Sequence, residues 1–315
     1  MAVPLLLQAL PGNGTAAPSP ADGDGGGVLL QAVAAGILVL ILAGVVWAVR
    51  RPPSETSPEM GWLEHAEELR RRILIALATW VGASLVTFSI RVEWTAAGWP
   101  VARPALQETL AAQAFRQLTE HLLPDNVQLV VTRPIDGFLA QLYLAFGIGF
   151  VVALPVIFVQ AHRFLAPGLH EHERRALRRA FLPAMGLFAA GVAFCWYAVL
   201  PLLLRTLYGY SSALGAQGLI QVSELVSFTL TMLGVFGVSF QLPLVMYLLT
   251  RVGLVSAAGY QRYWRHAAIG ILVFSAFATD PTLVSQALVA APLILLYGLG
   301  IVAARRAEAG LRAAT

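Results

Sequence analysis

The sequence lacks lysine and has few charged residues of any kind. Of its 315 residues, 12% are charged and 58% are hydrophobic, and all 21 basic residues are arginine. An ordinary soluble domain carries about 25% charged residues, so the composition excludes that class. The single cysteine, Cys195, excludes an internal disulfide framework and a cysteine-based zinc site.

Motifs that carry covalent chemistry are also missing. The sequence has no Ser/His/Asp catalytic set, no H-E-x-x-H zinc motif, no P-loop and no dinucleotide-binding fingerprint. We therefore expect no enzymatic activity, no cofactor and no bound metal. Without a P-loop, any transport by this protein would draw its energy from a partner that uses ATP or from the membrane potential. The membrane potential supplies about 2.3 kcal/mol per charge moved across 100 mV.

Long apolar runs make up most of the sequence. A bilayer core of about 30 Å requires roughly 20 apolar residues in a helix, and seven runs are candidate spans, the sixth of them short. They cover residues 28–49, 73–90, 138–161, 180–204, 225–250, 267–278 and 287–304. Prolines within or beside these spans tend to kink helices; they are Pro155, Pro183, Pro201, Pro243 and Pro292. The sequence predicts an all-α polytopic membrane protein with kinked helices.

The placement of the arginines predicts the orientation in the membrane. Sixteen of the 21 lie in alternate segments, which are 50–72, 163–179, 251–265 and 305–312. Basic residues are enriched in cytoplasmic loops, so we expect the N-terminus outside, the C-terminus inside and a plasma (inner) membrane location. The same rule accounts for the basic composition without a nucleic-acid partner. On the opposite side, residues 105–123 carry apolar positions at helical spacing and predict a helix on the outer surface.

The chain divides into three predicted parts. Residues 1–59 form an extension, with a Gly/Pro-rich segment expected to be disordered, an extra span at 28–49 and a linker. Residues 60–304 form the main bundle, and 305–315 form a cytoplasmic tail. Because Arg50 and Arg51 follow the extra span, it resembles an anchor more than a cleaved signal peptide, whose positive charge precedes the apolar run. An alternative is that Met60 is the true start.

Two charged segments on the arginine-rich side are candidates for binding. Before the second span, Glu68 precedes Arg72 by four residues, a spacing that favours an ion pair; Glu67 and Arg71 repeat it. The alternative to a ligand site is that this segment is an amphipathic, salt-bridged helical turn that leads into the second span (the lead-in). In the second segment, Glu173 has no basic residue three or four positions later, so it is either free to bind an external cation or a plain first-turn acid.

Four polar residues stand in or beside the spans. Glu224 lies at the start of the fifth span, Gln241 within it, and Asp280 and Gln286 around the last turn. Polar groups at membrane depth usually face a bundle interior or a cavity. For Gln241 the alternative is an interhelical hydrogen bond, worth about 0.6 to 2 kcal/mol, and Asp280 could simply cap a helix.

These segments together resemble the TatC family, the multispanning subunit of the twin-arginine protein translocase. Residues 65–72 resemble the family's H-x-x-E-L-R-x-R lead-in, and residues 164–175 resemble its first cytoplasmic-loop signature. Residues 236–243 resemble F-G-x-x-F-E-x-P, and residues 279–286 resemble the turn T-P-x-D…S-Q. The four motifs occur in the family's order between residues 60 and 304.

The resemblance implies a six-span, glove-shaped bundle that binds signal peptides carrying an Arg-Arg pair and exports folded proteins with the proton-motive force. It assigns Glu68 and Glu173 to the signal peptide's arginines, with Phe164 and Arg70 in the same site. Gln241, Glu224, Asp280 and Gln286 are then intramembrane polar or partner contacts. Implied partners are single-span TatA/TatB-type subunits, twin-arginine precursors, the lipid bilayer and further copies of the chain.

The sequence departs from the family pattern at two motifs. Gln241 replaces the intramembrane glutamate, and Thr282 occupies the usual position of the aspartate that Asp280 resembles. The extra span before Met60 also lies outside the six-span pattern. Two other classes remain open, a small-solute secondary transporter, which predicts inverted repeats and broken helices, and a non-catalytic membrane scaffold.

Overall fold

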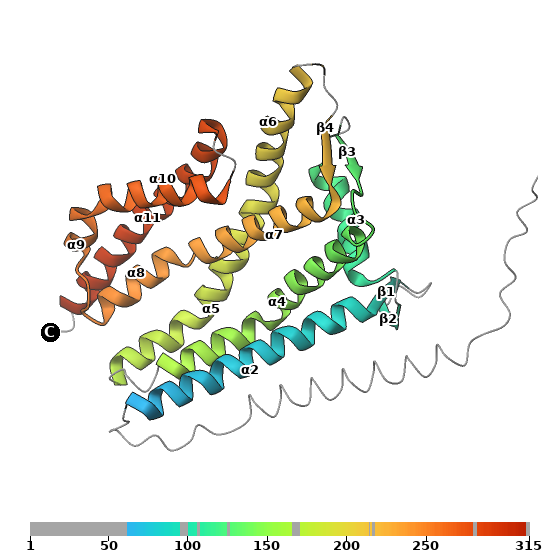
Figure 1. The fold of residues 1–315 in the computed structure, drawn as a ribbon. Helices are drawn as coiled ribbons and strands as arrows, with labels where there is room; N and C mark the ends of the chain where they lie inside the picture. The colour runs from blue at the N-terminus through green and yellow to red at the C-terminus, as the bar shows by residue number, and fades with distance from the viewer. Residues whose placement is uncertain are drawn as a thin grey trace, which may run out of the picture.

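The chain is mainly helical (Figure 1). The computed structural model describes residues 62–94, 100–105, 108–124, 127–165, 171–213, 215, 218–279 and 282–312. The helices are α2 (Trp62–Ser89), α3 (Leu110–Leu122), α4 (Asp136–Leu165), α5 (Glu171–Phe194), α6 (Leu200–Ala213), α7 (Val222–Ser239), α8 (Leu242–Arg251), α9 (Ala257–Arg262), α10 (Trp264–Ala278) and α11 (Leu283–Arg312). The predicted extra span at 28–49 lies outside the described residues.

Five described helical stretches are long and apolar enough to cross a membrane, which confirms the all-α polytopic class. They are Glu64–Ser89, Asp136–Leu165, Leu177–Ser211, Val222–Arg251 and Leu283–Gly310. The sixth predicted span is short, as expected: α10 has 15 residues. At 1.5 Å per residue α10 is about 22 Å long, less than the roughly 30 Å of the bilayer core.

The arginine-rich segments lie at one end of the bundle. Figure 1 shows α2 and α4 side by side on one flank, α10 and α11 on the other, and α7 with α8 crossing between them. The start of α2, the end of α4, the helix α9 and the C-terminal end of α11 lie at the same end. The buried core is formed between α3, α4, α6 and α7 by side chains such as Leu118, Leu144, Leu200 and Phe236.

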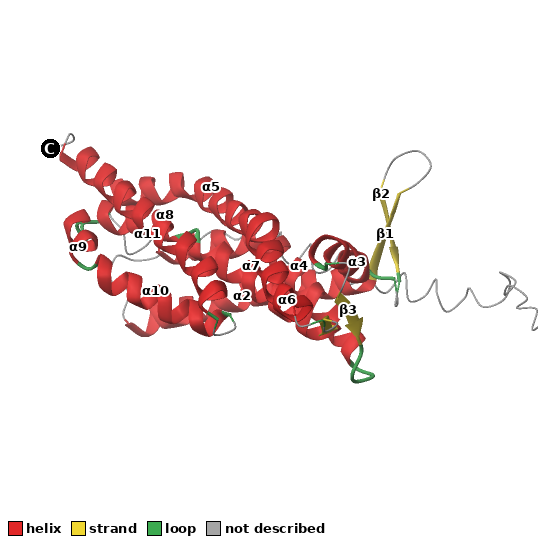
Figure 2. Ribbon diagram, turned by 90° about the horizontal axis from the view of Figure 1, so that it is seen from above, coloured by secondary structure: helices red, strands yellow, loops and turns green. Residues whose placement is uncertain are grey.

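Four strands, which the sequence analysis did not predict, lie at the opposite end. Strand β1 (Ile90–Trp94) pairs antiparallel with β2 (Pro100–Pro104), and β3 (Val127–Val130) pairs in parallel with β4 (Gly218–Gln221). Figure 2 shows the β1–β2 hairpin projecting beyond α3. The helix predicted at 105–123 is α3, which begins later because Thr109 caps it by accepting a hydrogen bond from Ala112 N–H.

The prolines of the long helices take two kinds of position. Pro155, Pro183 and Pro292 lie inside α4, α5 and α11. Pro201 follows a π-helical turn, Cys195–Val199, in which Leu200 N–H donates to the carbonyl five residues earlier. Because proline has no N–H and its ring clashes with the carbonyl four residues before it, the wider π turn relieves that clash.

Close packing of α2 on α4 depends on a glycine. A Cβ added to Gly149 would lie 2.6 Å from the backbone nitrogen and 2.7 Å from the Cα of Ser84. Nearby, the indole Nε1 of Trp80 donates to the carbonyl of Phe146 at 2.8 Å. The two helices therefore meet backbone to backbone at this point, as transmembrane helices do where small residues allow it.

We expect Gly149→Ala to destabilise the protein by about 1–3 kcal/mol, because the added methyl forces α2 and α4 apart. The matched control is Gly186→Ala on α5, where no atom lies within 4 Å of the added Cβ. Since alanine has the higher helix propensity, the control should be neutral or stabilised by up to about 1 kcal/mol. Thermal unfolding in detergent measures both, and equal midpoints for the two variants would contradict this packing.

Candidate functional site

The candidate site lies where the first turns of α2 meet the last turn of α4. The ring of His65 stacks on the ring of Phe164, with centroids 4.6 Å apart and planes inclined by 22°. Glu68 follows His65 by three residues and so lies on the same side of α2. The structure thus places Glu68 on the side of α2 whose His65 contacts the predicted residue Phe164.

Glu68 is paired on one side only. Its Oε1 accepts a hydrogen bond from Arg72 Nε at 3.1 Å, and Arg72 Nη2 contacts the same oxygen. Both side chains are 13% exposed. The other oxygen, Oε2, is buried and has no hydrogen-bond partner among the described residues. Because a buried, unpaired carboxylate oxygen is unfavourable, this oxygen is suited to accept a donor from outside the chain.

The predicted pairing of charges on α2 is confirmed in part. The Glu68–Arg72 ion pair forms, whereas Glu67 and Arg71 are exposed and make no ion pair with any described residue. Arg70 is also exposed. Of the salt-bridged lead-in the structure shows one ion pair, Glu68–Arg72, and this pair coexists with the unpaired oxygen of Glu68.

Gln160 is a polar residue of this region that the sequence analysis missed. It lies one turn before Phe164 on α4, is 4% exposed, and its Nε2 has no hydrogen-bond partner in the described part of the chain. A glutamine within an apolar span is the signal that could have identified it. Gln160 adds a second unsatisfied polar group to the end of α4 that carries Phe164.

Glu173 lies in the first turn of α5, as predicted. Its side chain, and residues 166–170 before the helix, lie outside the described part of the chain. The prediction that Glu173 is free to bind a cation therefore rests on its sequence neighbours alone.

Gln241 lies at a break between two helices. The backbone N–H of Gln241 donates to the carbonyl of Val238, and helix α8 begins immediately afterwards with Pro243 in its first turn. The side-chain Nε2 donates to the carbonyl of Ala184 on α5 at 3.0 Å. The interhelical hydrogen bond considered as an alternative is thus present in the structure.

The remaining predicted polar residues lie away from Glu68. Glu224 is exposed in the first turn of α7, and Gln286 Nε2 donates to the carbonyl of Leu272, joining α11 to α10. Asp280 lies outside the described residues. Thr282 accepts a hydrogen bond from Ser285 N–H at the start of α11, so a threonine fills the capping role considered for Asp280.

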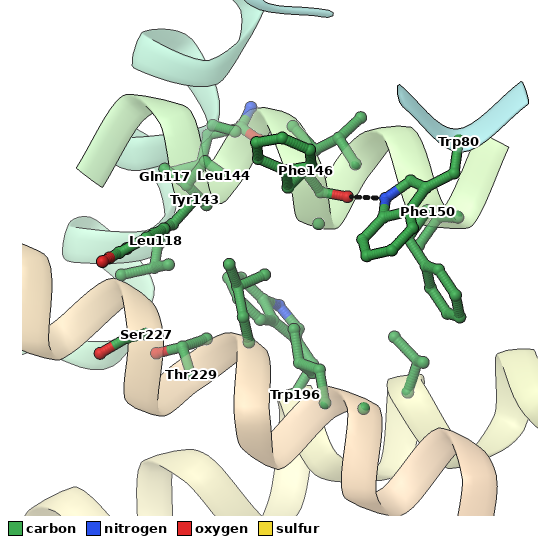
Figure 3. Close-up of a pocket in the computed structure, with 18 of the residues that line it drawn as sticks. Trp80, Gln117, Leu118, Tyr143, Leu144, Phe146, Phe150, Trp196, Ser227 and Thr229 are labelled. Carbon is green, nitrogen blue, oxygen red and sulfur yellow. Dashed lines mark hydrogen bonds between the residues drawn. The ribbon is translucent and has the colours of Figure 1, made fainter. Parts of the chain in front are cut away.

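An apolar pocket of about 570 Å³ lies farther along the bundle, between α2, α3, α4, α5 and α7 (Figure 3). Figure 3 shows Trp80 and Phe150 at one end and Gln117, Ser227 and Thr229 at the other. None of the described residues that line the pocket is acidic or basic. Among the described residues, no group of three His, Cys, Asp or Glu side chains could hold a metal ion.

Comparison with known proteins identifies the family. The model of the family described as "Sec-independent protein translocase protein (TatC)" matches residues 64–292. The chain belongs to the TatC family. It is therefore a translocase subunit of the Sec-independent system and a multi-pass membrane protein.

Individual TatC proteins resemble the chain over most of their length. A Sec-independent protein translocase protein TatC from Cenarchaeum symbiosum is 38% identical over 79% of this chain and 96% of its own. That from Deinococcus radiodurans is 34% identical over 81% and 88%. A crystal structure of the twin-arginine translocase receptor TatC superposes with a TM-score of 0.65 at 28% identity, covering 78% of this chain and 100% of the other.

The TatC match spans the elements that form the candidate site. It includes most of α2, all of α4 and α5, and the break at Gln241. The residues before Glu64 lie outside it. The candidate site thus lies within the part of the chain that matches the family.

Proposed function

We propose that this chain is the receptor subunit of the translocase, which binds Arg-Arg signal peptides and exports folded proteins with the proton-motive force. The observation that supports it best is the carboxylate of Glu68, whose Oε2 is buried without a partner among the described residues, one helical turn from His65, which stacks on Phe164. An arginine of the signal peptide would supply the missing donors.

In this proposal the two glutamates have different roles. Glu173 has no basic residue at the following helical positions and can engage a guanidinium with both oxygens. Glu68 shares Oε1 with Arg72 and contributes one oxygen. Phe164 offers a ring against which a guanidinium can stack. Arg70 lies in the same segment before the second span as Glu68. Lysine cannot reproduce such planar, bidentate contacts.

The arginine-rich end would then face the cytoplasm, where precursors arrive. Single-span TatA/TatB-type subunits, and further copies of this chain, would be the membrane partners. The protein would catalyse no covalent reaction. The span at 28–49 would cross the membrane as an additional anchor, with the N-terminus outside.

One structural feature favours a small-solute transporter: the helix is broken at Gln241, and broken helices are typical of such proteins. However, the amide of Gln241 already donates to Ala184, and the adjoining turn Phe240–Gln241 retains its backbone hydrogen bonds. The amide nitrogen of Gln241 and the two backbone N–H groups of the turn are therefore already engaged, and the receptor remains the better supported function.

The test is the affinity of the purified protein, in lipid nanodiscs, for a fluorescent peptide with an Arg-Arg pair. We expect Glu68→Gln to weaken binding about tenfold, because one charge-assisted hydrogen bond becomes neutral. Glu67→Gln is the matched control, since Glu67 lies one position away, is exposed and forms no ion pair. Equal affinities for the two variants would exclude Glu68 from the site.

A further inference from the structure

The junction of α9 and α10 carries two arginines that flank two exposed aromatic residues. The Cζ of Arg262 lies 5.8 Å from the ring centroid of Tyr263, and that of Arg265 lies 5.9 Å from the ring of Trp264. Tyr263 is 56% exposed and Trp264 is 48% exposed. These four residues, the junction surface, present cations and ring faces to the outside of the protein.

Positive charge on the junction surface is not neutralised by an ion pair with any described residue. Residues 251–279 contain no acid, and neither arginine forms an ion pair with a described residue. Glu308 reaches this end of the bundle from α11, but its Oε1 accepts a hydrogen bond from Ala257 N–H at 2.6 Å. The ring of His266 lies 5.8 Å from that of Tyr263 and completes the aromatic side of this surface.

The position of the junction surface along α10 matches the level of lipid headgroups. Beyond it, α10 exposes apolar side chains at intervals of four residues, Ile269, Val273 and Phe277, which are 61%, 52% and 88% exposed. This spacing places them on one face of the helix. Tyrosine and tryptophan favour the boundary between headgroups and hydrocarbon, so the arginines lie where lipid phosphates would be.

We propose that the junction surface binds the headgroup of an anionic phospholipid. Arg262 and Arg265 would hold the phosphate through charge-assisted hydrogen bonds, which guanidinium groups form bidentately. Tyr263 and Trp264 would contact the glycerol region, and an acyl chain would follow the apolar face of α10. That face distinguishes a lipid from a free phosphate ion, which has no apolar part to bury. This site is separate from Glu68 and does not depend on signal-peptide binding.

The experiment titrates the purified full chain in detergent with phosphatidylglycerol or phosphatidylcholine and measures bound lipid by native mass spectrometry. Each arginine near an anionic headgroup contributes about 1 kcal/mol, or roughly fivefold. We therefore expect Arg262→Gln/Arg265→Gln to lower the preference for phosphatidylglycerol about ten- to thirtyfold. The matched control, Arg305→Gln/Arg306→Gln, removes the same charge from exposed positions on α11 and should change the preference less than twofold.

Two further arms distinguish a lipid site from its alternatives. Trp264→Ala keeps the charge and should weaken binding of both lipids, because the ring contacts a region that they share. Inorganic phosphate should not displace phosphatidylglycerol, and displacement at equal concentration would show a free-anion site and overturn the proposal. Equal losses in the two arginine double variants, or no preference in the original protein, would also overturn it.

Discussion

Replacing Asp136 by alanine is expected to lower the free energy of unfolding by about 2–4 kcal/mol. The carboxylate is fully buried at the start of α4. It accepts hydrogen bonds from Thr132 Oγ1 at 3.0 Å and from Arg133 N–H at 2.8 Å, and its other oxygen accepts one from Arg133 Nε at 3.0 Å. Alanine removes every one of these bonds at a position that is closed to solvent.

The measurement for Asp136 is thermal unfolding in detergent, with two comparison variants. Asp136→Asn keeps an acceptor and should lose less stability than Asp136→Ala. Glu120→Ala removes an exposed acid from α3 on the same side of the bundle and should change stability by less than about 0.5 kcal/mol. If Asp136→Ala unfolded at the same temperature as Glu120→Ala, the buried network would contribute nothing.

Glu173→Gln should weaken binding of an Arg-Arg peptide by about 10- to 150-fold, the range given by 1.5–3 kcal/mol for hydrogen bonds to a charged group. The effect exceeds that of Glu68→Gln because Glu173 has no basic neighbour at the following helical positions and can offer both oxygens. Binding of the fluorescent peptide in nanodiscs measures the loss.

A double-mutant cycle gives the Glu173 prediction its control. Each peptide arginine is changed in turn to glutamine and tested against Glu173→Gln. One arginine should show a coupling energy above about 1 kcal/mol with Glu173, because contacting residues are not additive. Glu171→Gln, two positions earlier in the same turn, should show no coupling to either arginine. Coupling of equal size for Glu171 and Glu173 would mean that the helix start attracts cations without selecting them.

The sequence predicted those features that depend on local spacing. The apolar runs located the long helices, and the four-residue spacing of Glu68 and Arg72 predicted their ion pair. The motif order predicted the family. The helices extend beyond the apolar runs, as α2 shows by beginning at Trp62, because polar residues continue a helix once it has formed.

Features that join distant segments could not be predicted. The parallel pairing of Val127 with Gly218 and the stacking of His65 on Phe164 depend on tertiary packing, which leaves no local pattern. Pro243 was expected to kink its helix, but the hydrogen bond from the amide of Gln241 to Ala184 at the same break joins two helices and has no local sequence pattern. The burial of Gln160 is likewise a consequence of packing.

Discrimination between arginine and lysine tests the receptor account most directly. The purified protein is photocrosslinked to a signal peptide with an Arg-Arg pair and to its Lys-Lys counterpart at the same concentrations. Both peptides carry the same charge, so attraction to the carboxylates alone would label equally. If Glu68 and Glu173 bind guanidinium groups bidentately, the Arg-Arg peptide should be labelled at least tenfold more strongly. Equal labelling of the two peptides would contradict the account.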